Sequence, residues 1–312
     1  MRRRVPWLIA PVLMVIASGA RQSERRAPGR ADYHVHLSLE APGFLDSLIA
    51  RGVTAVRDCG GDLDSLLRWR DEIAAGRRRG PRLYIAGPLL DGPKPGATYR
   101  ITITDVASAE RAVDSLSGRH VDFLKVHNAV PVAAFFALLR RARARGLQVA
   151  AHLPRGVPAW VAIDSGAGSI EHAAESLLSS PIYAGFATTA TEALAWWKSP
   201  AGDSIIKSMG RQHAIVVPTL VRYEAMINSV DDSSVRAARA AALPELITLV
   251  ARMNAAGVRI RAGTDVAGLP GVPSTWLALD REQQLLAQAG LSLAQLRTST
   301  DPDSLAAWIR GH

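Results

Sequence analysis

The segment ADYHVHL, residues 31–37, is a short apolar run in which His34 and His36 are separated by a single residue. Successive side chains of a β-strand point to opposite faces, so both imidazoles lie on the same face if the run is a strand. Two imidazoles on one face can bind the same divalent ion. The segment therefore predicts a strand that ends in metal ligands.

The rest of the chain repeats one unit: an apolar run, a polar loop and a stretch with helical periodicity. Counting residues 31–37, there are eight runs, and the other seven are residues 53–59, 82–90, 122–128, 148–153, 168–173, 214–220 and 258–266. Helical patterns lie between them at residues 43–52, 62–76, 107–118, 132–146 and 243–257, several closed by a glycine suited to a helix C-cap. This alternation indicates a parallel sheet, and eight repeats predict an α/β fold of the (β/α)8 TIM barrel type over residues 31–312.

Several metal-ligand residue types occur at the ends of these predicted strands. The carboxyl ends of the strands meet at one face of a barrel, so residues far apart in sequence converge there. Imidazole nitrogen and carboxylate oxygen are the donors that zinc-like ions accept. The candidate site, which includes one lysine, consists of His34, His36, Lys125, His152, His172 and Asp265. No role is assigned to His120, His127, His213 or His312.

Composition supports a folded, non-nucleic-acid-binding protein. The 312 residues are 48% hydrophobic and 21% charged, which argues against disorder. The net charge is +9, but the arginines are spread over predicted helices, and no basic stripe is interleaved with aromatic residues. We therefore expect no nucleic-acid partner. The single cysteine, Cys59, excludes an internal disulfide framework.

The first residues resemble a secretory leader. Three arginines at positions 2–4 precede an apolar run over residues 5–17 and the small residues Ser18, Gly19 and Ala20. This layout predicts a signal peptide over residues 1–20 and a polar tether over residues 21–30. The run is shorter than the ~20 residues that a membrane span needs, so no stable span is expected after cleavage. The predicted location is exported, either periplasmic or extracellular.

With its strand-end ligands, the chain resembles the amidohydrolase superfamily of metal-dependent barrels. The segments GVTAVRDCGG (52–61), GPRLYIAGPLL (80–90), DFLKVHN (122–128), GSIEHA (168–173), VVPTL (216–220) and AGTD (262–265) are similar to the imidazolonepropionase-related and Xaa-Pro dipeptidase branch. The resemblance spans residues 31 to about 303. Relatives usually carry a small β-sandwich built from residues on both sides of the barrel, and this chain is expected to be a minimal barrel that lacks it.

The resemblance implies a binuclear centre with two divalent metal ions, zinc being the expected metal. His34, His36 and Asp265 would hold one ion, and His152 and His172 the other. Lys125 would be carboxylated and bridge them, the alternative being an ordinary lysine that extends from the barrel rim. A metal-activated hydroxide would attack the substrate, and Asp265 would serve as both ligand and catalytic base.

Other positions are weaker candidates. Tyr223 follows the seventh predicted strand, where a phenol could bind a substrate carbonyl or carboxylate, although ordinary loop packing is equally compatible. Arg57 and Asp58 close the second strand and suggest a structural ion pair or support beneath the metals. The long insert at residues 173–213 could form a lid or specificity loop. Its Trp196 and Trp197 could contact the substrate, but we expect them to pack the insert onto the barrel.

These expectations point to a hydrolase of amide or peptide-like C–N bonds in a small substrate, such as an Xaa-Pro or other dipeptide. Two alternatives stay open at the level of sequence. The same site could hydrolyse a lactone, a cyclic amide or a phosphotriester, or the chain could be a non-catalytic degenerate metal-binding barrel. The sequence also leaves open a homo-oligomer.

Overall fold

The computed structural model describes residues 29–39, 43–94, 99–265 and 275–311. The predicted signal peptide and residues 21–28 of the tether lie outside this part of the chain. The first strand begins at Arg30, the last residue of the predicted tether. Among the described residues, no helix combines the length and the apolar character that a membrane crossing requires.

The strands are parallel, and neighbouring strands follow chain order except for β5, which lies at a sheet edge beside β4. They are β1 Arg30–Val35, β2 Val53–Asp58, β3 Arg82–Ile85, β4 Leu89–Asp91, β5 Arg100–Thr102, β6 Leu124–Val126, β7 Val149–Ala151, β8 Ser169–Glu171, β9 Ile215–Val217 and β10 Arg259–Ile260. One sheet has the order β1-β2-β3 and the other the order β10-β9-β8-β7-β6-β4-β5. Every described pair is parallel, as the alternation of runs and helices predicts.

Backbone hydrogen bonds join the two sheets into a closed barrel. The N–H of Tyr33 in β1 donates to the C=O of Ala262 beyond β10 (2.9 Å), and the N–H of Asp265 donates to the C=O of His34 (2.7 Å). On the other side, the N–H of Asp122 donates to the C=O of Ile85 in β3 (2.8 Å). The (β/α)8 fold predicted from the sequence is therefore confirmed.

The third predicted strand differs from expectation because residues 82–90 are divided into β3 and β4. Gly87 between them has φ +72°, a left-handed conformation that glycine adopts without steric cost. Pro88 follows and has no N–H to donate to a neighbouring strand. β4 continues the barrel beside β6 and also pairs with β5, a short strand that the sequence pattern did not reveal.

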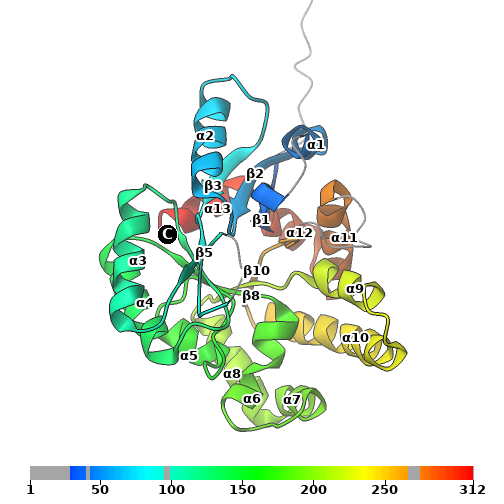
Figure 1. Ribbon diagram of the computed structural model, residues 1–312. Coiled ribbons are helices and arrows are strands. Elements are labelled where there is room, and N and C mark those ends of the chain that lie inside the picture. The colour runs from blue at the N-terminus through cyan, green and yellow to red at the C-terminus, as the bar shows by residue number, and fades with distance from the viewer. Residues whose placement is uncertain (1–28, 40–42, 95–98, 266–274, 312) are drawn as a thin grey trace, which may run out of the picture.

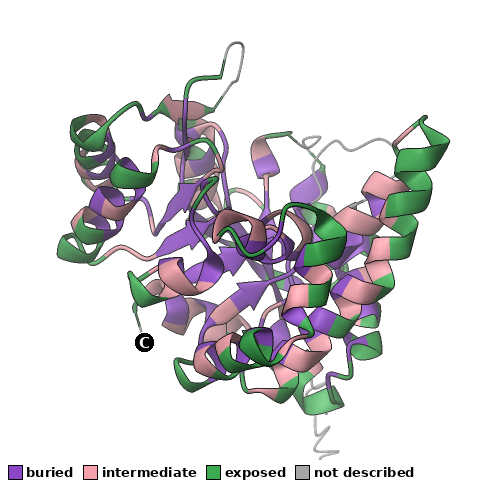
Figure 2. Cartoon of the chain, turned by 90° about the horizontal axis from the view of Figure 1, so that it is seen from below, coloured by how far each residue is buried: buried purple, intermediate pink, exposed green. Residues whose placement is uncertain are grey.

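Helices surround the strands. They are α1 Phe44–Ala50, α2 Leu63–Ala74, α3 Val106–Gly118, α4 Val132–Ala144, α5 Ala159–Asp164, α6 Ser180–Tyr183, α7 Ala190–Trp197, α8 Pro200–Arg211, α9 Leu220–Asn228, α10 Ser233–Ala255, α11 Thr275–Gln288, α12 Leu293–Ser299 and α13 Pro302–Ile309, with the short 3-10 helix η1 Leu37–Leu39 and the π-helix η2 Ala173–Leu178. Figure 1 shows the strands at the centre with helices around them, and Figure 2 shows buried residues on the strands and exposed residues on the outer helix faces.

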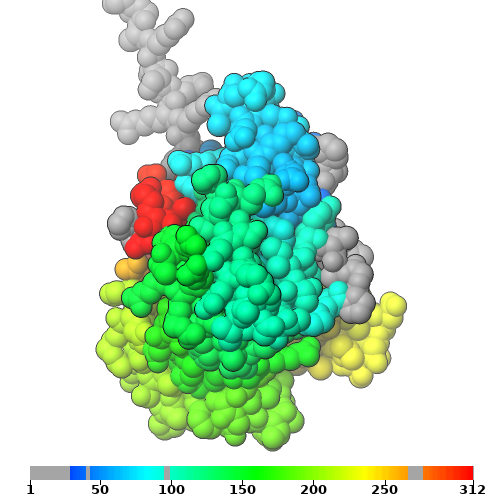
Figure 3. Space-filling model, turned by 60° about the vertical axis from the view of Figure 1, so that its left-hand side comes forward, coloured from blue at the N-terminus to red at the C-terminus, as the bar shows by residue number. Residues whose placement is uncertain are grey.

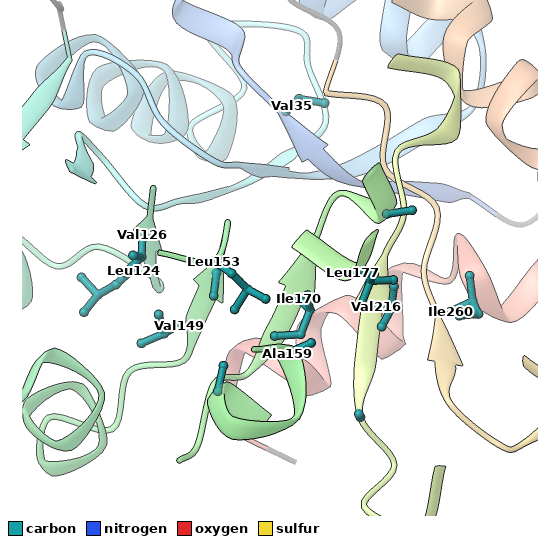
Figure 4. Packing of buried hydrophobic residues seen from close by; sticks show 14 of the residues in the cluster. Val35, Leu124, Val126, Val149, Leu153, Ala159, Ile170, Leu177, Val216 and Ile260 are labelled. Atoms are coloured by element: carbon teal, nitrogen blue, oxygen red, sulfur yellow. The ribbon is translucent and has the colours of Figure 1, made fainter. Parts of the chain in front are cut away.

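The core between strands and helices is apolar. Figure 4 shows Val126, Val149, Ile170, Val216 and Ile260 of successive strands side by side in this layer. Because side chains alternate along a strand, the residues next to them in sequence point into the barrel instead. This alternation directs polar residues of the strands toward the barrel interior.

The C-terminal helix α13 packs at the amino end of the barrel. Trp308 in α13 is buried, and its indole N–H donates to the C=O of Gly168 just before β8 (2.9 Å). The ring of Trp308 lies 5.5 Å from that of Phe123, the residue before β6. Figure 3 shows the red C-terminal segment beside cyan and green segments, so distant parts of the chain meet here. This end lies opposite the carboxyl ends of the strands.

The insert at residues 173–213 folds as η2, α6, α7 and α8. Trp197 is buried, and its indole N–H donates to the C=O of Leu177 in η2 (2.9 Å). Trp196 is partly buried and stacks on Trp160 of α5, with 5.4 Å between ring centroids. The predicted packing of the insert by its tryptophan pair is confirmed.

We expect Trp308→Ala to destabilise the protein by about 3–5 kcal/mol, because a large buried ring and its hydrogen bond are lost. The free energy of unfolding would be measured by urea titration followed by circular dichroism. Leu293→Ala is the control, since that side chain is 75% exposed, and its expected effect is within about 0.5 kcal/mol. Equal stability of wild type and Trp308→Ala would contradict the packing role of α13.

Candidate metal centre

The two histidines of β1 both face Asp265, which follows β10. Nε2 of His36 lies 3.0 Å from Oδ1 of Asp265, and Nε2 of His34 lies 3.4 Å from the same oxygen. The side chain of His34 is fully buried, whereas that of His36 is 14% exposed. The same-face placement predicted from the spacing of two residues is therefore confirmed.

Two further predicted ligands stand at the same end of the barrel. The ring of His172 lies 4.8 Å from that of His34 and 4.6 Å from that of His152. Nδ1 of His172 is hydrogen-bonded to Oγ1 of Thr219 (2.9 Å) and lies 3.6 Å from Oδ2 of Asp265. One ligand atom each from His34, His172 and Asp265 fall within 4.8 Å of one another, so a single ion could contact all three.

Lys125 is the middle residue of β6 and is 1% exposed. Its neighbours Leu124 and Val126, both labelled in Figure 4, belong to the apolar core layer outside the strands. Because side chains alternate along a strand, Lys125 points into the barrel. Burial is the main cause that lowers the pKa of His152, and the positive charge of Lys125 contributes further. Lys125 thus lies close enough to the histidines to act on them electrostatically.

The charge state of the cluster suits a divalent cation. Burial lowers the pKa of His152 and His172 well below the usual value and that of His34 to about 4, so these three imidazoles are neutral at pH 7. Burial also acts to lower the pKa of His36, but its contact with Asp265 outweighs burial and raises that pKa above its usual value. Burial alone would raise the pKa of Asp265, but the Arg222 guanidinium, 2.5 Å away, and the hydrogen bond with His36 hold it well below its usual range. Neutral imidazoles around an ionised carboxylate are the donor set that zinc binds.

An unpartnered nitrogen supports the same conclusion. Nε2 of His34 is buried and makes no hydrogen bond with any described residue, while Nδ1 is hydrogen-bonded to Glu171. A buried polar atom without a partner costs about 1–3 kcal/mol unless another group satisfies it. Since Nε2 points toward Asp265, an ion held there would satisfy it, and these residues fit a metal.

Three strand ends that build the cluster have left-handed backbone conformations. His172 has φ 67°, Thr219 has φ 48° and Asp265 has φ 48°. Such conformations cost roughly 1–3 kcal/mol each for residues other than glycine and persist where the surrounding structure imposes them. Their concentration at the ends of β8, β9 and β10 orients the two candidate ligands and the hydroxyl that contacts His172.

A buried ion pair supports His34 from below. Nδ1 of His34 lies 2.7 Å from Oε2 of Glu171, and Nη2 of Arg57 lies 2.7 and 2.8 Å from the two Glu171 oxygens. Burial alone would raise the pKa of Glu171, but Arg57 and His34 lower it to about 2. The Arg57 guanidinium also lies over Trp308, 4.5 Å from its ring centroid.

The suggestion of an Arg57–Asp58 ion pair is wrong. Arg57 pairs instead with Glu171, the partner of His34, and this contact is compatible with the suggestion that Arg57 supports the candidate site from beneath. Consecutive residues of a strand point to opposite faces, so only Arg57 turns toward Glu171. Asp58 accepts backbone hydrogen bonds from Leu37 (2.7 Å) and Gly60 (3.1 Å) instead. These bonds fix the loop after β1, which carries His36.

Two polar residues at the site, an arginine and a histidine, were missed by sequence reasoning. Nε of Arg222, in the first turn of α9, lies 2.5 Å from Oδ2 of Asp265. His127 lies 4.5 Å from His152 between ring centroids, and its Nδ1 is 3.1 Å from Oδ2 of Asp91. Tyr223, the predicted substrate residue, is half-buried against the apolar core. Sequence could not show which of residues 222 and 223 faces the site.

The fold is shared with solved amidohydrolases and prolidases. A bottromycin amidohydrolase is 24% identical with a TM-score of 0.69, covering 91% of this chain and 67% of that one. A putative prolidase from Bifidobacterium longum is 24% identical (TM-score 0.65, 91% and 69% covered), and a Xaa-Pro dipeptidase with bound methionine in its active site is 19% identical (TM-score 0.65, 91% and 75% covered). No family model and no curated protein sequence matches the chain. The likeness establishes the barrel fold of these hydrolases.

We expect Glu171→Gln to weaken zinc binding about 10- to 100-fold, because the variant no longer holds His34 through a charged hydrogen bond. Zinc affinity would be measured by competition with a coloured chelator, and folding by circular dichroism. Glu282→Gln is the matched control, since Glu282 is an equally buried glutamate that is not among the candidate ligands or their described partners. Unchanged zinc affinity in folded Glu171→Gln would refute the positioning role.

Glu282 also gives the protein a pH-dependent stability. Its Oε2 accepts the backbone N–H of Val221 (2.8 Å), and burial raises its pKa from 4.5 to about 8. Between these values the unfolded chain loses a proton that the folded chain keeps, so stability falls as pH rises, by up to about 1.4 kcal/mol per pH unit.

Glu282→Gln should therefore become progressively more stable than wild type between pH 5 and pH 8. The amide keeps an oxygen for the Val221 N–H and carries no proton to lose. Melting temperatures of both proteins across this pH range would test the expectation. A constant difference between them would show that Glu282 is ionised in the folded protein.

Proposed function

We propose that this protein is a metal-dependent hydrolase of the amidohydrolase superfamily that cleaves an amide or peptide-like C–N bond in a small substrate. The observation that carries the proposal is the cluster of four imidazoles, three of them neutral, around ionised Asp265 at the carboxyl end of the barrel. Active sites of (β/α)8 enzymes are built at this end. The shared fold with amidohydrolases and prolidases supports the same chemistry.

The proposed centre holds two divalent ions, with zinc as the expected metal. His34, His36 and Asp265 would bind one ion and His152 and His172 the other. Lys125 would be carboxylated, since a free ammonium is repelled by cations whereas a carbamate offers negative charge and two oxygens. When bound, such ions activate a water molecule as nucleophile and polarise the substrate carbonyl.

Asp265 is the proposed proton carrier of the reaction. Its low pKa keeps the carboxylate ionised at neutral pH, so one oxygen can accept the proton of the attacking water. The same carboxylate would then deliver that proton to the leaving nitrogen. His36, 3.0 Å from Oδ1, limits the orientations that the carboxylate can adopt.

Dipeptides with a C-terminal proline or another residue are the proposed substrates, because several structures of the same fold are named prolidases or Xaa-Pro dipeptidases. The leader-like residues 1–20 suggest that the protein acts outside the cytoplasm. Hydrolysis of scavenged peptides in the periplasm or outside the cell is a role compatible with both features.

We expect wild type purified with zinc and bicarbonate to contain about two zinc ions per chain and to hydrolyse glycyl-L-proline. Lys125→Ala should contain one ion or none, because the bridging group is lost. His152→Ala should lose hydrolysis while keeping its circular dichroism spectrum. Zinc would be counted by mass spectrometry and proline release by a colorimetric assay.

Lys207→Ala is the matched control, since Lys207 is an exposed lysine of α8 and its loss should change neither property. One zinc ion in both wild type and Lys125→Ala would indicate a mononuclear centre. No zinc in either protein, together with no hydrolysis, would identify a non-catalytic barrel.

A further inference from the structure

All three nitrogens of the Arg57 guanidinium donate hydrogen bonds inside the barrel. Nε donates to the C=O of Tyr33 (2.5 Å), Nη1 to Oγ of Ser169 (3.0 Å) and Nη2 to both carboxylate oxygens of Glu171 (2.7 and 2.8 Å). The N–H groups of an arginine lie in one plane, so these bonds all engage the edge of the group. The two flat faces of the guanidinium are left for other contacts.

Aromatic rings surround the Arg57 guanidinium. Its central carbon lies 4.5 Å from the ring centroid of Trp308, 5.5 Å from that of Phe123 and 5.9 Å from that of Tyr33. Arg57 is fully buried, and Trp308 is 5% exposed. A cation is attracted to the face of an aromatic ring, most strongly to tryptophan and where water is excluded. Trp308, the closest of the three rings, therefore makes the largest contribution to this attraction.

Trp308 also contacts the strand that carries Glu171. It belongs to α13, which packs against β1 and β2 and is drawn in red in Figure 1. Its indole N–H donates to the C=O of Gly168 (2.9 Å), which directly precedes β8. A Cβ at Gly168 would lie 3.2 Å from the indole ring, so the ring and this end of β8 are closely packed. Trp308 thus fixes Arg57 and β8 relative to each other.

Glu171 connects these contacts to the candidate metal centre. Its Oε2 lies 2.7 Å from Nδ1 of His34, and Nε2 of the same ring lies 3.4 Å from Oδ1 of Asp265. An ionised carboxylate only accepts hydrogen bonds, so Nδ1 carries the proton and Nε2 keeps its lone pair for an ion. The orientation of His34 therefore depends on where Arg57 holds Glu171.

The alternative is that Trp308 only fills space at the amino end of the barrel, as Leu305 does one turn earlier in α13. Both side chains are buried in the same apolar cluster. The aliphatic side chain of Leu305 offers Arg57 neither a hydrogen bond nor an aromatic face. Loss of Leu305 therefore weakens the packing of the helix without removing such a contact to the cation, which makes it a comparison for Trp308.

We propose that Trp308 is a positioning residue of the candidate metal centre. Through Arg57 and Glu171, its ring holds His34 in the orientation that binds a metal ion at the opposite end of the barrel. The inference rests on the proposed function, which places an ion on His34. Without the ring, the ion pair loses its apolar cover, so water reaches Arg57 and weakens the attraction that orients Glu171. The C-terminal helix thereby determines metal affinity as well as stability.

The first test measures the zinc affinity of the full chain by competition with a coloured chelator. Trp308→Leu has no aromatic face and should bind zinc about 10-fold more weakly than wild type, the lower end of the effect of altering the groups that support a ligand. Trp308→Phe keeps a ring and loses the bond to Gly168, so its affinity should lie between those of wild type and Trp308→Leu. If Trp308→Leu does not fold, the comparison of Trp308→Phe with wild type decides the proposal.

Leu305→Ala is the matched control, because it removes a buried side chain from the same helix. Urea titration would give the free energy of unfolding of each variant in parallel. Leu305→Ala should lose stability and keep the wild-type zinc affinity. Equal weakening of zinc binding in Leu305→Ala and Trp308→Leu would show that stability alone controls the affinity, and would overturn the proposal.

A measurement on the metal-free protein separates this inference from the proposed hydrolase function. The Nδ1 proton of His34 is held by Glu171 away from water, so it should give a resolved low-field proton NMR signal, identified by its absence in His34→Gln. The signal should shift or disappear in Trp308→Leu and stay unchanged in Leu305→Ala. This result in a protein that neither binds zinc nor hydrolyses dipeptides would support the positioning of His34 and reject the proposed function. Hydrolysis by wild type, with an unchanged signal and unchanged zinc affinity in Trp308→Leu, would overturn the inference alone.

Discussion

The candidate metal centre depends on one buried ionic interaction, between Arg57 of β2 and Glu171 of β8. Neither side chain is exposed to solvent, so each charge needs the other. Glu171 also contacts Nδ1 of His34, and this leaves Nε2 free to face Asp265. On the other side, Arg57 lies against Trp308 of the C-terminal helix. A continuous set of contacts thus connects α13 at the amino end of the barrel to the candidate ligands at the carboxyl end.

The same region concentrates unfavourable backbone conformations. His172, Thr219 and Asp265 are all left-handed, and only the packing around them can hold them so. The approach of the segment after β10 to β1 contributes, since a Cβ at Gly263 would lie 2.8 Å from Cβ of His34. These backbone conformations lower the stability of the fold while they orient the candidate ligands. Such strain is usual where binding or catalysis requires a fixed geometry.

Charged groups from several elements surround the candidate metal centre. His34, His152 and His172 are neutral, and the ionised groups around them are Asp265, Glu171, Glu175, Arg57 and Arg222, with Lys125 buried nearby. If Lys125 is carboxylated, its charge becomes negative, so that negative groups outnumber the two arginines and divalent ions are favoured.

Much of this architecture can be predicted from short-range patterns of the sequence. Alternating apolar runs and helical stretches predict the barrel, and the spacing of His34 and His36 places both on one face. The positions of Lys125, His152, His172 and Asp265 in or just after predicted strands bring these residues to one end of a barrel, because parallel strands share a direction. Local patterns predicted the wrong structure where it depends on residues distant in sequence. Residues 82–90 form two strands divided at Gly87 instead of one, and Arg57 pairs with Glu171 instead of Asp58. The choice between Arg222 and Tyr223 is of the same kind. By itself, the sequence determined the barrel and the order of its candidate ligands along the chain. Only the tertiary structure decided which charged groups contact these residues, because such contacts join different strands and helices.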